Sequence, residues 1–168
     1  LFGKFVLKTS AKVGLLGQYS GSNKGLSPFE RFELGGNGLN GSGGAQQGKD
    51  FISARGYDVS DYEANAQGNG TAAFNKFAME LRYPFSLNPS MTFYALAFVE
   101  GSNAYSSVKD YNPFDLKRSA GIGVRAFLPM FGTIGFDYGL GFDKELNNPA
   151  AKWSDYGTFN IVLGFEPQ

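Results

Sequence analysis

Residues 133–143 read Thr-Ile-Gly-Phe-Asp-Tyr-Gly-Leu-Gly-Phe-Asp, and two kinds of side chain alternate along them. One set is large and apolar and consists of Ile134, Phe136, Tyr138, Leu140 and Phe142. The intervening set holds only threonine, glycine and aspartate. A period of two is typical of a β-strand. Because the second face has nothing to pack into a protein core, we expect the apolar face to contact lipid, as in a transmembrane β-barrel.

The composition agrees with a strand-based membrane protein. The 168 residues include 24 Gly, 17 Phe and 9 Tyr, which suit strands, tight turns and interfacial aromatic girdles. The 42% of hydrophobic residues and the mean hydropathy of −0.22 are also ordinary for a soluble protein, so they do not decide between the two classes. A helical membrane protein is excluded because no stretch of about 18 apolar residues exists.

The charged and reactive residues exclude several functions. Fifteen basic residues balance fifteen acidic ones, so nucleic acid is not an expected partner. The chain has neither Cys nor His, which excludes disulfides, thiolate nucleophiles, serine triads and imidazole-based metal sites within it. We therefore expect no enzyme, no catalytic residue, no cofactor and no metal site.

Alternation predicts six strands, at about 4–19, 73–83, 91–101, 116–128, 133–143 and 156–165. In the first, Lys4, Lys8 and Lys12 share one face, which we expect to border an aqueous lumen. The strand at 91–101 is apolar on both faces until Glu100, so its orientation stays open, and a β-bulge could shift its phase.

The connections alternate in length. Short ones are expected at 84–90 and 129–132, and long ones at about 20–72, 102–115 and 144–155. In outer-membrane barrels the short turns are periplasmic, which predicts a periplasmic C-terminus. Six strands are fewer than the roughly eight of the smallest known single-chain barrels. We expect either the C-terminal segment of a longer barrel or a barrel assembled from several copies.

Six short motifs indicate a family. They are Phe32–Gly36, Ala54–Tyr57, Phe77–Pro84, Phe98–Gly101, Ser119–Arg125 and Gly132–Gly139. Their order resembles the C-terminal barrel of BamA-type outer-membrane protein assembly factors, the bacterial surface antigen type, over nearly the whole chain. The resemblance implies that residues 1–168 are the last six strands of an all-β, antiparallel transmembrane barrel of about sixteen strands.

The resemblance also implies that the long extracellular loop at about 20–72 folds into the lumen. Ala54-Arg55-Gly56-Tyr57 matches the Val-Arg-Gly-Phe-like tetrad at the tip of that loop. A confined guanidinium needs carboxylate partners. Positions Glu80 and Glu100 match the family's partners, Glu100 replacing the usual Asp, and alternation alone also turns Glu80 to the lumen. We predict an ion pair, within about 6 Å, between Arg55 and Glu80 or Glu100. The simpler alternative is that Arg55 is a surface residue of an Arg-Gly turn.

Residues 157–165 resemble the last strand of this family, which ends in an aromatic residue that assembly machinery reads. The resemblance implies that this strand forms a lateral gate, and an ordinary amphipathic strand would look the same. The predicted gate residues are Gly157, Phe159, Ile161, Leu163 and Phe165.

Two further patterns are expected to carry no chemistry. Residues 36–41 have a GxGxxG spacing but lead into a glycine-rich loop and not a helix, which argues against nucleotide binding. Asp58, Asp61 and Glu63 have no EF-hand spacing, so we interpret them as solvated acids rather than calcium ligands.

The function implied by the resemblance is that of a non-enzymatic insertase in the outer membrane of a Gram-negative bacterium. Its expected partners are outer-membrane lipid, unfolded outer-membrane protein clients and accessory lipoproteins. Two alternatives remain: a two-partner-type secretion pore of the same superfamily, and a passive porin or structural barrel.

Overall fold

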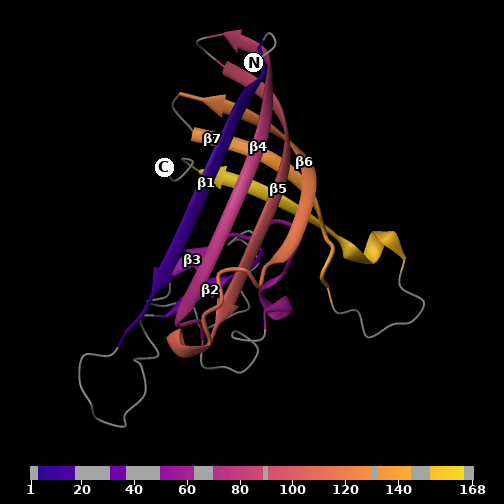
Figure 1. The fold of residues 1–168 in the computed structure, drawn as a ribbon. Coiled ribbons are helices and arrows are strands. Elements are labelled where there is room, and N and C mark those ends of the chain that lie inside the picture. The colour runs from indigo at the N-terminus through magenta and orange to yellow at the C-terminus, as the bar shows by residue number, and fades with distance from the viewer. Residues whose placement is uncertain are drawn as a thin grey trace.

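The computed structural model describes residues 4–17, 31–36, 50–62, 70–88, 91–129, 132–144 and 152–164. Six of the strands form one antiparallel sheet in the order β1-β4-β5-β6-β7-β8, curving from β1 at one edge to β8 at the other (Figure 1). The strands are β1 (Val6–Leu15), β4 (Ala73–Asn88), β5 (Met91–Tyr105), β6 (Lys117–Leu128), β7 (Gly132–Gly141) and β8 (Gly157–Gly164). The predicted fold class, an antiparallel barrel segment of six strands, is confirmed, and the sheet of this chain is open.

The strand ends differ from those predicted. The strand expected to end at Tyr83 continues to Asn88, because a bulge between Pro84 and Ser86 absorbs the proline that had suggested a turn. β5 likewise continues to Tyr105, which pairs with Ala73. β1 begins two residues after the expected start at residue 4 and ends at Leu15; residues 18 and 19 of the expected strand lie outside the described residues. β6, β7 and β8 differ from expectation by one or two residues at an end.

Strand register fixes the two faces of the sheet. Glu80 pairs with Phe98 and Met79 with Val99, which turns Glu100 to the inner face and resolves the open orientation of β5. The outer face is apolar and exposed on every strand; Ile122, for example, is 67% exposed. Its large side chains include Leu7, Leu81, Val99, Ile122, Phe136 and Phe159.

The inner face is covered by the described parts of the segment between β1 and β4. In this segment β2 (Phe32–Leu34) and β3 (Asp50–Ile52) pair in parallel, and a 3-10 turn, η1 (Val59–Asp61), follows (Figure 1). Their apolar side chains meet those of β4 and β5 in a small core of Leu34, Ala54, Tyr57, Tyr62, Phe74 and Ala104. Two more 3-10 turns, η2 (Val108–Asp110) and η3 (Trp153–Tyr156), lie in the other long connections. None of the helices in the described ranges has the length and apolar character of a membrane span.

Candidate functional site

The candidate site begins at a tight turn over Ala54–Tyr57. The Ala54 amide donates to the carbonyl of Gly36 at 3.3 Å, and the Gly36 amide donates to the carbonyl of Tyr57 at 2.7 Å. Gly56 has a φ of +90°, a conformation that glycine adopts at little cost. This turn presents the Arg55 side chain to the inner face of the sheet, where the residue is only 9% exposed.

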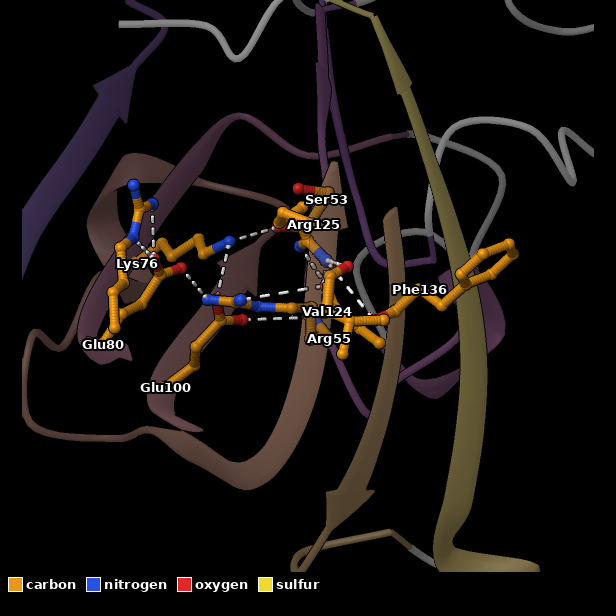
Figure 2. Close-up of polar contacts among 10 residues, drawn as sticks. Ser53, Arg55, Lys76, Glu80, Glu100, Val124, Arg125 and Phe136 are labelled. Atoms are coloured by element: carbon orange, nitrogen blue, oxygen red, sulfur yellow. Dashed lines mark hydrogen bonds and ion pairs between the residues drawn. The ribbon is translucent and has the colours of Figure 1, made fainter. Parts of the chain in front are cut away.

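Two carboxylates hold Arg55 (Figure 2). Its Nε donates to Glu100 Oε1 at 2.7 Å, its backbone amide donates to Glu100 Oε2 at 3.1 Å, and its Nη2 donates to Glu80 Oε1 at 2.6 Å. The guanidinium also lies over the Phe98 ring, with Cζ 3.8 Å from the ring centroid. The predicted contact between Arg55 and the carboxylates is present with both of them, well inside 6 Å.

The two carboxylates stabilise the positive charge of Arg55. Burial alone would lower the pKa of Arg55, but attraction to Glu100 and Glu80 outweighs it and raises that pKa. Each carboxylate also has a second cation. Arg82 donates to Glu80 Oε2 at 2.9 and 2.6 Å. Lys76 Nζ lies 3.3 Å from Glu100 Oε1 and donates to the Ser53 carbonyl (Figure 2).

A second buried ion pair joins the cluster from the neighbouring strands β6 and β7. Arg125 on β6 donates from Nη1 and Nη2 to the two oxygens of Asp137 on β7, at 2.7 and 2.6 Å. The Asp137 side chain has no exposed surface, and its Oδ2 lies 3.8 Å from Arg55 Nη1. Asp137 therefore faces two guanidinium groups, one from the sheet and one from the turn.

Two glycines of β7, Gly139 and Gly141, allow the Ala54–Tyr57 turn to lie directly against the strand. A Cβ on Gly139 would lie 2.8 Å from the backbone nitrogen of Gly56, and one on Gly141 would lie 2.6 Å from its carbonyl oxygen. These contacts are with backbone, which cannot rotate aside as a side chain can. The small inner face of β7 thus lets the Arg55 turn approach the sheet closely.

Tyr57 fastens the turn to the strand ends. Its hydroxyl donates to the Arg118 carbonyl at 2.7 Å and accepts from the Asp143 amide at 3.0 Å. Burial raises the pKa of Tyr57 to about 12, opposed by the hydrogen bond from Asp143. Tyr57 is neutral near pH 7 and supplies both a donor and an acceptor.

The predicted gate residues form a separate set. Phe159, Ile161 and Leu163 point outward on β8, and Phe165 lies outside the described residues. A Cβ on Gly157 would lie 2.1 Å from the Tyr138 hydroxyl, so the tyrosine side chain occupies the space beside this glycine. Leu163 and the other outward side chains do not contact the Arg55 cluster, which is on the opposite face.

Of the three acids interpreted above as solvated, Asp58 and Asp61 lie near a lysine. Lys144 Nζ is 3.9 Å from Asp58 Oδ2 and 3.6 Å from Asp61 Oδ2, and Glu63 lies outside the described residues. Of the GxGxxG stretch only Gly36 is described, and it braces the Arg55 turn. Sequence reasoning missed Lys76, Arg82, Arg125 and Asp137 as members of the cluster. The signal that could have found them is the period-two alternation, which puts all four on the face opposite the apolar side chains.

Comparison with known proteins gives one match. Residues 1–166 match the family model of the Omp85 superfamily domain. No curated protein matches the chain, and no solved structure matches it.

Proposed function

From the premise that this chain belongs to the Omp85 superfamily, which serves protein insertion and secretion at the bacterial outer membrane, we propose that it is part of an insertase. The protein folds other outer-membrane proteins and inserts them at a lateral gate that includes β8. The observation that carries the proposal is the Arg55 turn, seated on the glycines of β7 and held by Glu80 and Glu100.

The buried ion pairs favour a loop with one defined docked position. Removing one partner of a buried pair leaves the other charge uncompensated and costs about 3–5 kcal/mol. Arg55 meets both carboxylates at once, so the turn is held much more firmly than a surface loop would be. A docked turn on the inner face also argues against a wide passive pore.

β8 has the features required of a gate strand. In the described sheet it pairs with β7 alone, from Leu140↔Gly157 to Thr133↔Gly164. Its other edge can offer backbone groups to an incoming client strand, the mode called β-augmentation. The apolar Phe159, Ile161 and Leu163 would keep such a hybrid sheet in contact with lipid.

The test uses the full-length protein reconstituted in liposomes with an unfolded outer-membrane client, whose folding is followed by gel mobility. Glu100→Gln keeps the volume of the side chain but removes its charge, and should slow client folding about tenfold or more. Asp110→Asn, at an exposed position of η2 remote from the cluster, is the matched control and should fold clients at the wild-type rate. Equal rates for the two variants would contradict the proposal.

The same preparation separates the alternatives. A secretion pore would pass a soluble secreted partner across the liposome without integrating it. A passive porin would give a large, steady conductance that Arg55→Ala leaves unchanged.

We also propose accessory lipoprotein partners, a periplasmic C-terminus and no enzymatic activity. Because this chain has no native cysteine, Gln168→Cys gives a single label site within it. Labelling by an impermeant maleimide only after outer-membrane permeabilisation would support the periplasmic position, and labelling of intact cells would refute it.

A further inference from the structure

A hollow of about 950 Å³ lies on the outer face of the sheet, opposite the Arg55 cluster. Its floor is made of small residues, and its walls are larger apolar side chains. The floor is Thr9, Ala11, Gly101 and Ala120, and the walls are Phe77, Met79, Val99, Leu116 and Phe142. Apolar hollows of this size are common small-molecule sites, and this one opens on the face that contacts lipid.

One end of this outer-face groove carries an exposed cation. Arg118, the second residue of β6, lines the groove and its side chain is 71% exposed. Its Nε and Nη2 donate to Asp143 at 3.1 and 2.8 Å. A guanidinium has five N–H donors, so three remain without a partner among the described residues.

We propose that the outer-face groove binds one acyl chain of an outer-membrane lipid, with the lipid phosphate held by Arg118. The arrangement places the two chemistries of such a lipid in their natural order, since Arg118 lies near a strand end, paired with Gly101, and the pair of Ala120 and Val99 lies deeper along the strands. Asp143 holds the guanidinium through two bonds, and the three other N–H groups can donate to a phosphate. This site is independent of the proposed insertase activity.

A second hollow on the same face supplies the matched control. It measures about 510 Å³ and is also apolar, with small residues such as Ala95 and Ala97 between Tyr83 and Phe136. Its lining contains no lysine or arginine. If acyl chains alone decided binding, both hollows would contribute equally.

The test measures one-to-one lipid adducts of the full-length protein by native mass spectrometry. The probe is dimyristoyl phosphatidic acid, compared with dimyristoylglycerol, which lacks the phosphate, and with inorganic phosphate, which lacks the chains. We expect retention of phosphatidic acid alone. Arg118→Gln and Ala120→Phe should each weaken it about tenfold, Asp143→Asn should strengthen it, and Ala97→Phe should leave it unchanged.

Three outcomes would overturn the proposal. Equal binding of dimyristoylglycerol would show that the phosphate is not recognised, and binding of inorganic phosphate with the same affinity would show that the groove is not used. An equal loss in Ala97→Phe and Ala120→Phe would indicate general lipid contact. The comparison of the three probes needs only the wild-type protein, so it decides the matter even where a variant fails to fold.

Discussion

Gly139→Ala should release the Arg55 turn from the sheet. The added Cβ would lie 2.8 Å from the Gly56 nitrogen and 3.2 Å from the Arg55 carbonyl carbon, whereas ordinary contacts begin at 3.4 Å. The turn must therefore retreat by about 0.6 Å, and it cannot do so without lengthening the bonds between Arg55 and Glu100.

Overpacking of this kind costs about 1–3 kcal/mol, which is about a 5- to 150-fold change in the ratio of docked to undocked turn. The rate of trypsin cleavage after Arg55 measures that ratio, because the protease can cut there only when the turn is undocked. We expect cleavage at Arg55 in the full-length protein to accelerate by that factor. Cleavage at the exposed Lys152 serves as the internal reference.

Gly17→Ala is the matched control, because a Cβ at Gly17 meets nothing within 4 Å. It should leave the cleavage rate within about twofold of wild type, as expected of a surface change. The reasoning is refuted if Gly139→Ala also stays within that range, or if wild-type Arg55 is cut as fast as Lys152.

Three further predictions concern the titration, the buried pair and the outer face. Tyr57 should ionise near pH 12, measured as the difference in ultraviolet absorbance between wild type and Tyr57→Phe. Because its pKa is raised above the ordinary value of about 10, its contribution to loop docking should be complete below pH 10 and lost as the pH rises to about 12. An ionisation midpoint near pH 10 would contradict this prediction. Asp137→Asn removes the carboxylate that Arg125 and Arg55 share. It should lower the free energy of unfolding in guanidinium chloride by about 3–5 kcal/mol, and an unchanged denaturation midpoint would contradict this. Ile122→Arg should destabilise the barrel in liposomes by about 2–4 kcal/mol if Ile122 lies near the bilayer midplane, while Lys12→Arg on the inner face should not; equal effects would contradict the assignment of the two faces.

Alternation predicted the strands and their faces because lipid and water impose opposite demands on successive residues. It left β5 unresolved, where apolar residues occupy both faces, since Leu96 and Phe98 are buried on the inner face, Phe98 beneath the Arg55 guanidinium, while Val99 faces outward. It also misplaced the end of β4, because the bulge beside Pro84 depends on pairing with β5 and not on local propensity.

The Arg55 contacts could be predicted because the family resemblance and the alternation both identified Glu80. The pair of Arg125 and Asp137 could not, since these residues lie diagonally on neighbouring strands and only the observed register brings them together. The role of Gly139 was equally hidden, because it depends on the backbone of a turn more than 80 residues earlier in the sequence.

The Tyr57 hydroxyl has a consequence for timing. The Asp143 amide that donates to it lies just beyond the last paired residues of β6 and β7, Ser119 and Gly141. A backbone amide exchanges its proton with solvent only when its acceptor is lost. The rate of deuterium uptake at the Asp143 amide in the full-length protein therefore reports how often the Arg55 turn opens. The reporting amide lies far from the loop in the sequence.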